Sequence, residues 1–306
     1  MIDTKFLKNQ RILITGGTGS FGRALIDYLL DTNYLPSKII VFSRDELKQY
    51  QMIEKYQMHK HFNKLRFFLG DVRDKDRVKL AFKDVDILIH AAALKQVPAA
   101  EYNPFEFIKT NIFGAQNLIE ACLDTSIKKV IALSTDKASS PVNLYGATKL
   151  CSDKLFTLAQ NIVGKKKIKF SVVRYGNVFG SRGSVVPKFL NLGKNDYFPV
   201  TDKSMTRFNL TLKQSVEYVL KFLRLQKGGE IFVPKLSSFK IIDLCKAINK
   251  QKRVKYVGVR PGEKIHEELI SRYESNDTVD LGGYYIILPH DYHDTNFYYN
   301  KKKLKK

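Results

Sequence analysis

Two pairs of titratable residues lie close together in the segment STDKASSPVNLYGATKL, residues 134–150. Tyr145 and Lys149 are four residues apart, so on a helix their side chains share one face. A phenol with its ordinary pKa of about 10 is a poor base at neutral pH, but a nearby ammonium stabilises the phenolate and lowers that pKa. Asp136 and Lys137 place an acid beside a base. The segment therefore predicts a site that moves several protons.

The elements that would position these side chains are visible as apolar runs. Runs without polar alternation predict strands that are buried on both faces of a parallel sheet. Strand–helix alternation predicts an α/β fold, a doubly wound parallel Rossmann sheet that binds ligands at the carboxyl ends of its strands. The expected strands are 11–16, 38–43, 65–70, 85–92, 128–134 and 170–176, and the expected helices include 20–31, 45–57, 101–124 and 144–163.

The regular pattern weakens after residue 176. Glycine, proline and arginine mark loops there, although a helix at about 211–226 and a strand in GEIFVP (229–234) are expected to rejoin the core. We expect a nucleotide-binding Rossmann domain of residues 1–176, completed by about 209–234. Residues 177–208 and 235–306 are expected to form a smaller C-terminal substrate-binding lobe.

The composition excludes several classes of protein. With 306 residues, 44% of them hydrophobic, the chain can bury a sizeable core. No apolar run approaches the ~20 residues that a membrane span needs, and the N-terminus lacks the apolar core of a secretory signal, so a cytoplasmic protein is expected. Cys122, Cys151 and Cys245 show no metal or redox spacing and are expected to be small buried hydrophobes; no metal site is expected.

The net charge of +22 suits either a nucleic-acid partner or an anionic nucleotide ligand. Its lysine runs, at 165–167 and 301–306, are not interleaved with aromatic residues as on an RNA-binding face. We therefore expect no specific nucleic-acid binding.

A glycine-rich segment, TGGTGSFG, joins the first expected strand to the first expected helix. Gly16, Gly19 and Gly22 are spaced three residues apart, and glycine lets backbone N–H groups approach a pyrophosphate at the positive end of a helix. A glycine triplet alone is weak evidence. At a strand-to-helix junction that opens a βαβ series, it predicts a dinucleotide site.

The second expected strand ends in FSRDELK, without the acid that commonly binds the ribose 2′-hydroxyl of NAD. Ser43, Arg44 and Lys48 suit the 2′-phosphate of NADP instead. The alternative is helix capping, with Ser43 as N-cap and acids in the first turn, which leaves Arg44 unexplained. Asp71 and Val72 are expected near the adenine and Ala91 near the cofactor, whereas His90 is expected to be structural.

Taken together, the motifs resemble extended short-chain dehydrogenases/reductases, most closely the inverting UDP-N-acetylglucosamine 4,6-dehydratases of nonulosonic-acid pathways such as that of pseudaminic acid. The matching segments run from about residue 10 to 270. They are ILITGGTGSFG, SRDELKQ, GDVRD, HAAALKQVPAAEYNP, ALSTDKA, NLYGATKL, VVRYGNVFGSRGSVVP, MTRF, GGEIFVP and RPGEK.

The resemblance implies a reaction and a role for each central residue. Tyr145, supported by Lys149, would deprotonate the hydroxyl at sugar carbon 4 while NADP takes the hydride, which later returns to carbon 6. Thr135 would hydrogen-bond the oxygen at carbon 4, and Asp136 would protonate the hydroxyl leaving carbon 6. Retaining relatives carry Asp-Glu where this chain has Asp-Lys, so Lys137 would be the base at carbon 5, with a pKa lowered by desolvation, and would support inversion. The alternative is that Lys137 only pairs with Asp136.

The resemblance also implies the binding residues. The cofactor set is Gly16, Thr18, Gly19, Ser20, Phe21, Gly22, Ser43, Arg44, Lys48, Asp71, Val72, Ala91, Lys95, Asn111, Tyr145, Lys149 and Val178. The set for UDP-N-acetylglucosamine is Lys95, Asn177, Arg182, Val185, Arg207 and Arg260. Relatives form homo-oligomers, often hexamers. Two alternatives remain open: a UDP-sugar 4-epimerase of the same fold, and a non-catalytic dinucleotide-binding regulator.

Overall fold

Consecutive residues of strand β1 (Arg11–Thr15) are buried on opposite faces of a sheet. Ile12 and Ile14 belong to one hydrophobic cluster and Leu13 to another. This explains the unbroken apolar run, because both faces of the sheet are covered. The computed structural model describes residues 3–193, 196–289 and 302–303.

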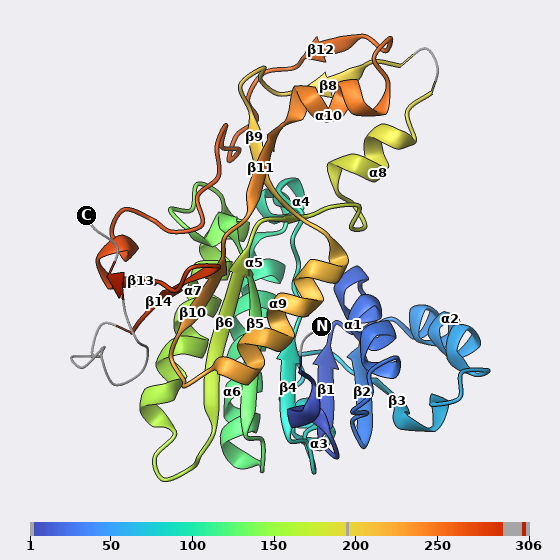
Figure 1. Ribbon diagram of the computed structural model, residues 1–306, viewed down its shortest axis with the longest axis vertical. Coiled ribbons are helices and arrows are strands. Elements are labelled where there is room, and N and C mark those ends of the chain that lie inside the picture. Colours follow the sequence, from blue (N-terminus) through green and yellow to red (C-terminus); the bar gives the residue numbers. More distant parts are fainter. Residues whose placement is uncertain (1–2, 194–195, 290–301, 304–306) are drawn as a thin grey trace.

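The large sheet confirms the doubly wound α/β fold (Figure 1). Seven neighbouring strands run parallel in the order β3-β2-β1-β4-β5-β6-β10, and β14, β13 and β15 continue the sheet antiparallel. The order reverses between β1 and β4, where ligands bind in such folds. The strands are β1, β2 (Lys38–Ser43), β3 (Leu65–Leu69), β4 (Ile87–His90), β5 (Lys129–Thr135), β6 (Lys169–Tyr175), β10 (Ile231–Pro234), β13 (Thr278–Asp280), β14 (Tyr284–Ile287) and β15 (Lys302–Lys303).

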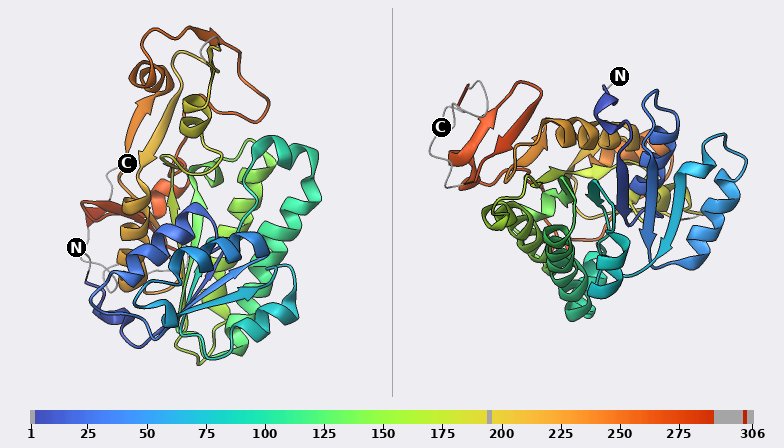
Figure 2. Two further views of the ribbon diagram at one scale, coloured as in Figure 1. Left: turned by 90° about the vertical axis from the view of Figure 1, so that its right-hand side faces the viewer. Right: turned by 90° about the horizontal axis from the view of Figure 1, so that it is seen from below.

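Helices cover both faces of this sheet. Helices α1 (Ser20–Leu30), α2 (Glu46–Tyr56) and α9 (Leu212–Leu225) pack on one face, and α3 (Lys75–Ala81), α6 (Gly114–Asp124) and α7 (Leu144–Leu158) on the other. Figure 2 shows α7 and α9 on opposite sides. Helix α7 is followed by a 3-10 turn, Ala159–Ile162.

The helix expected over 101–124 is interrupted. The chain forms α4 (Val97–Tyr102), α5 (Pro104–Phe107), a π-helical turn (Ile108–Phe113) and then α6. Proline lacks a backbone N–H and disfavours a helical conformation in the preceding residue. Asn103 accordingly leaves the helical region, with φ −125° and ψ 61°.

The remaining elements form the lobe at one end of the sheet (Figure 1). Helices α8 (Val185–Leu190) and α10 (Ile241–Ile248) pack with β8 (Phe198–Val200) around their own hydrophobic cluster. Strand β12 (Val254–Tyr256) pairs with β8. A three-stranded sheet of β7 (Asn177–Val178), β9 (Thr206–Leu210) and β11 (Ser237–Lys240) joins the lobe to the core.

The observed division differs from the expected one at the C-terminal end. Strands β13 and β14 belong to the large sheet, although residues 235–306 were expected in the lobe. Their pairing covers an edge of the sheet that β10 would otherwise expose. Of the lysine-rich segment 301–306, only residues 302–303 fall within the described residues.

The composition led to expectations about the cysteines and about membrane-spanning segments. Cys122 and Cys245 are buried, but Cys151 is exposed, because its position on α7 faces away from the sheet core. Among the described residues, no helix is both long and apolar enough to cross a membrane.

Candidate active site

A cleft of about 1420 Å³ lies between the carboxyl ends of the parallel strands and the lobe. It is lined by every residue of the expected cofactor and substrate sets except Asn111. Of the expected catalytic residues, Thr135, Lys137, Tyr145 and Lys149 line it. Asp136 is fully buried behind the wall of the cleft.

The glycine-rich turn fits a dinucleotide at one end of this cleft. Gly16 has φ +67°, and a Cβ there would lie 2.8 Å from the carbonyl oxygen of Ala91, so only glycine fits. Helix α1 begins after Gly19, and no side chain caps its N-terminus. Free N–H groups at a helix N-terminus suit a pyrophosphate.

The end of β2 carries cations that already have acidic partners. Arg44 Nη1 lies 3.4 Å from Asp71 Oδ2, and Lys48 pairs with Asp45. Burial would raise the pKa of Asp71, but the guanidinium groups of Arg73 and Arg44 outweigh burial and hold that pKa below its usual range. Asp45, not Ser43, is the N-cap of α2. Ser43 belongs to β2 and accepts a hydrogen bond from Gln49, so it is not available as a cap.

Asn111 and His90 have supporting positions. The Asn111 side chain accepts a hydrogen bond from the Leu94 N–H and donates one to the Leu94 carbonyl oxygen. It also donates to Thr148 Oγ1 on α7 at 3.0 Å. It thus fixes the β4 loop against the catalytic helix instead of lining the cleft. His90 is 2.7 Å from Thr15 Oγ1, and burial, reinforced by the Lys149 charge, lowers its pKa to about 3. These contacts agree with a structural histidine.

Tyr145 and Lys149 lie on α7, whose N-cap Asn143 accepts from the Gly146 N–H at 2.8 Å. Lys149 Nζ donates to the carbonyl oxygen of Leu133 at 2.8 Å. Burial lowers the pKa of Lys149, and burial raises the pKa of Tyr145 to about 12. The positive charge that opposes the Tyr145 shift is that of Lys137, whereas the sequence assigned this effect to Lys149.

Lys137 lies between two carboxylates. Its Nζ is 3.0 Å from Asp136 Oδ1 and 3.2 Å from Glu267 Oε1. Burial alone would lower the pKa of Lys137, but the two negative charges outweigh it and raise the pKa above its ordinary value. The expected lowering is therefore wrong in sign, because the sequence did not reveal the second carboxylate.

Glu267 is the site residue that sequence reasoning missed. Its side chain is 3% exposed and lines the cleft, although it lies 130 positions beyond Lys137 in the chain. The only sequence signal was its position three residues after RPGEK, the segment that contains Arg260.

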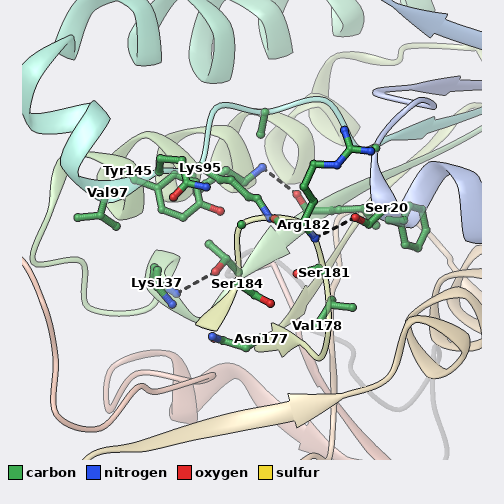
Figure 3. A pocket seen from close by; sticks show the side chains of 18 of the residues that line it. Ser20, Lys95, Val97, Lys137, Tyr145, Asn177, Val178, Ser181, Arg182 and Ser184 are labelled. Carbon is green, nitrogen blue, oxygen red and sulfur yellow. Dashed lines mark hydrogen bonds between the residues drawn. The ribbon is translucent and has the colours of Figure 1, made fainter. Parts of the chain in front are cut away.

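Two of the expected substrate residues, Lys95 and Arg182, contact each other in the cleft. Figure 3 shows Lys137 and Tyr145 toward one end of the pocket and Ser20 and Arg182 toward the other. Lys95 Nζ donates to the Arg182 carbonyl oxygen at 3.3 Å, and the Arg182 N–H donates to Ser20 Oγ at 3.1 Å. These contacts join the loop after β7 to the glycine-rich end of the cleft.

Arg207 is also engaged. Its Nη1 donates to the carbonyl oxygens of Thr206 and Ile265, and its Nη2 lies 3.6 Å from Glu263 Oε1. Arg207 is 7% exposed, so its charge faces the cleft from a fixed position.

A second buried charge group supports α7 from below the cleft. Arg174 is fully buried and bonds Asp153 Oδ2 on α7 at 3.2 Å and Glu274 Oε1 at 2.9 Å. Ser134 Oγ donates to the same Asp153 oxygen at 2.7 Å. The group ties β5, β6 and α7 to the C-terminal segment.

Comparisons with known proteins agree with this architecture. A family model described as polysaccharide biosynthesis protein matches residues 12–289, beyond the expected end of the resemblance near 270. The chain is 55% identical over 283 residues to an inverting UDP-N-acetylglucosamine 4,6-dehydratase of Campylobacter jejuni, covering 92% of this chain and 83% of the relative.

Two further proteins are similar to this chain over most of its length. A UDP-glucose 4-epimerase of Rickettsia bellii is 42% identical over 296 residues, covering 94% of this chain and 85% of that protein. The solved structure of Pen from Bacillus thuringiensis has a TM-score of 0.88 and 38% identity, covering 93% of this chain and 90% of that one.

Proposed function

The chain belongs to the polysaccharide biosynthesis protein family of extended short-chain dehydrogenases/reductases, and on that premise we propose that it is an inverting UDP-N-acetylglucosamine 4,6-dehydratase. The observation that carries the proposal is the acid–base pair of the fully buried Asp136 and the partly exposed Lys137, which interacts with Tyr145 at the cleft. Removal of water needs a proton donor and a carbon base in addition to the Tyr145/Lys149 pair. The similarity to the Campylobacter jejuni dehydratase supports the same assignment.

We propose NADP as the dinucleotide. When bound, NADP would supply the hydride acceptor for oxidation at sugar carbon 4 and the hydride donor for reduction at carbon 6. The turn at Gly16 and the N-terminus of α1 would hold the pyrophosphate, and Arg44 and Lys48 would hold the 2′-phosphate. Replacing Arg44→Ala should weaken NADP binding and leave NAD binding nearly unchanged, as measured by calorimetry. An equal loss of affinity for NADP and NAD would contradict the proposed preference for NADP.

Tyr145 takes the proton from the hydroxyl at carbon 4. Burial raises its pKa to about 12, whereas the positive charge of Lys137 opposes that shift and so favours the phenolate form, which accepts the proton. Lys149 is buried on the same helix as Tyr145, and its Nζ donates to the Leu133 carbonyl, which fixes its position. Thr135 lies at the same wall and donates to Asp136 Oδ1 at 3.0 Å.

The proposed roles of Asp136 and Lys137 require one proton to move between them. Lys137 is an ammonium at rest, because two carboxylates surround it. It gives a proton to Asp136 along their 3.0 Å hydrogen bond and becomes a neutral amine. The amine takes the proton from carbon 5, and the electron pair of that C–H bond enters the enolate of the carbon-4 ketone. We propose that the proton on Asp136 then reaches the hydroxyl leaving carbon 6, which departs as water, although Asp136 itself is fully buried and does not line the cleft.

Inversion requires that carbon 5 regain a proton on the face opposite to the one that lost it. Lys137 lies on the face that loses the proton, so inversion requires a different donor to deliver the proton from the opposite face. The product would be UDP-2-acetamido-2,6-dideoxy-β-L-arabino-hex-4-ulose, for bacterial surface-glycan or pseudaminic acid biosynthesis. We also propose a homo-oligomer, a hexamer by family resemblance, which sedimentation equilibrium would test.

Proton NMR of the purified protein with UDP-N-acetylglucosamine in deuterated water tests the function. A 4-keto-6-deoxy product with the L-arabino configuration and deuterium at carbon 5 is expected. A product epimerised at carbon 4 without loss of water would support the epimerase, the activity in the name of the Rickettsia bellii relative. Tight dinucleotide binding without turnover of UDP-sugars would support the regulator. The same keto sugar with carbon 5 retained would contradict the role of Lys137.

A further inference from the structure

Glu267 has three properties that a simple surface carboxylate lacks. Its side chain is 3% exposed, its Oε1 is 3.2 Å from Lys137 Nζ, and it lines the cleft. Its second oxygen, Oε2, is buried and has no hydrogen-bond partner among the described residues. Burial of an ionised carboxylate is unfavourable unless the charge is compensated. In this site Lys137 supplies the compensation.

The chain holds Glu267 at this place from two sides. On the side of α7, Lys264 Nζ donates to the Ser139 carbonyl at 2.8 Å, and Asn143 Nδ2 donates to the Gly262 carbonyl at 2.7 Å. On the side of the lobe, the Ile265 carbonyl accepts from the Thr206 N–H at 3.1 Å. The segment that carries Glu267 is therefore fixed across the cleft entrance.

We propose that Glu267 is a positioning residue for the proton transfer at sugar carbon 5, an inference that rests on the dehydratase function proposed above. Its carboxylate holds Lys137 Nζ at the wall of the cleft and remains ionised while Asp136 gains and loses a proton.

The proton hand-off between Lys137 and Asp136 explains why a second carboxylate is needed. Whenever Asp136 is protonated, it no longer compensates the charge of an ammonium on Lys137. Once Lys137 has taken the proton from carbon 5, that ammonium, whose side chain is only 22% exposed, would lack a counter-charge from Asp136. Glu267 provides the charge at this stage, so it favours the proton transfer without contacting carbon 5 itself.

The same charge acts on the neighbouring groups. The titratable groups that interact with Lys137 are Asp136, Glu267, Tyr145 and Lys95. Because Asp136 and Glu267 are the negative ones, neutralising Glu267 removes one of the two charges that raise the pKa of Lys137. Glu267→Gln should thus lower the pKa of Lys137 while leaving the size of the side chain unchanged.

The first test does not depend on turnover. The full-length protein is trace-labelled with acetic anhydride at a series of pH values, and acetylation of Lys137 is followed by peptide mass spectrometry. In Glu267→Gln, labelling at neutral pH should rise about tenfold or more, since one pKa unit changes the amine fraction about tenfold. Glu268→Gln is the matched control, because Glu268 is exposed and, within the described part of the chain, its side chain accepts a hydrogen bond only from Ser140 Oγ, at 3.3 Å. An unchanged titration in Glu267→Gln would overturn the proposal.

The second test uses the reaction with UDP-N-acetylglucosamine. Glu267→Gln should lower kcat about 100-fold, at the low end for loss of acid–base assistance, and change KM by less than about threefold. Oxidation at carbon 4 should persist, and quenching with borodeuteride would trap that ketone as deuterium at carbon 4. The pH limb of kcat that reports Lys137 should move to lower pH, a shift that loss of packing alone would not cause.

The outcomes separate this inference from the function on which it rests. If the unaltered protein forms no dehydrated product, the proposed function fails, and the labelling experiment still decides whether Glu267 controls Lys137. If the unaltered protein forms the product and Glu267→Gln behaves like Glu268→Gln in both experiments, the role of Glu267 is wrong and the dehydratase stands.

Discussion

The close approach of α7 to the loop that carries Lys137 depends on the absence of a side chain at Gly146. A Cβ at this position would lie 2.2 Å from the carbonyl oxygen of Lys137 and 3.1 Å from its carbonyl carbon. An ordinary contact between carbon and oxygen is about 3.3 Å, so the two backbones would have to separate by about 1 Å. Both atoms belong to backbone, and neither can move away as a flexible side chain can.

We therefore predict that Gly146→Ala affects activity more than stability. Overpacking destabilises by about 1–3 kcal/mol, while alanine is favoured over glycine in a helix by about 1 kcal/mol. The net loss in the free energy of unfolding should thus be about 0–2 kcal/mol. A displacement of about 1 Å between Tyr145 and Lys137 should lower kcat about 100-fold.

The assay combines urea unfolding with NMR detection of the keto-sugar product. Gly283→Ala is the matched control, because among the described residues, its two chain neighbours aside, no atom lies within 4 Å of the added Cβ, and the backbone at Gly283 has no positive φ. This control should change kcat by less than about twofold. A Gly146→Ala variant with unaltered kcat would refute the argument that the two backbones must touch for the site to form.

Three further predictions address the site and its support. Tyr145→Phe should lower the rate of product formation by about 10²–10⁴-fold in the NMR assay, with dinucleotide affinity within about threefold of the original, because only the hydroxyl that takes the carbon-4 proton is removed. Arg174→Met should reduce the free energy of unfolding by about 3–5 kcal/mol in urea, since it removes the buried guanidinium that pairs with Asp153 and Glu274, whereas Arg224→Met, at an exposed ion pair, should change it by less than about 1 kcal/mol. Burial would raise the pKa of Glu274, but the guanidinium of Arg174 outweighs burial and holds that pKa below its ordinary value of 4.5. The stability that this ion pair contributes is therefore present above pH 4.5 and is lost as the pH falls through the lower pKa of the folded state. Glu274→Gln should accordingly flatten the decline in stability measured below about pH 4.5; an equally steep decline would contradict the assignment.

Local signals were enough to predict the parallel sheet and the residues at its carboxyl ends. Continuous apolar strands such as 11–16 predicted burial on both faces, and the glycine-rich turn after that strand predicted the cleft end that Gly16 now forms. These features depend on residues close in the chain, so a pattern can reveal them. The expected helix over 101–124 failed for a local reason as well, since Pro104 interrupts it.

The electrostatic state of the site required contacts between distant residues. The sequence places Lys137 beside Asp136, but Glu267 comes near only because the 262–265 segment bonds to both α7 and β9. Likewise, the strands 278–287 joined the large sheet through pairing with β10, which no local pattern indicated. The direction of the Lys137 pKa shift therefore could not be predicted from the sequence.

Lysine in the position of a carbon base poses a problem that glutamate does not. A glutamate is ready to accept a proton when ionised, whereas a lysine must first lose one, and a buried site disfavours any charge left alone. Two carboxylates beside one ammonium solve this problem. One of them can exchange a proton with the lysine, while the other stays negatively charged and compensates the charge of the ammonium. The geometry around Lys137 has this form, with Asp136 on the adjacent residue and Glu267 from the far end of the chain. Through these contacts the charge state of Lys137 depends on both carboxylates, so the base that we propose is a property of the three residues together.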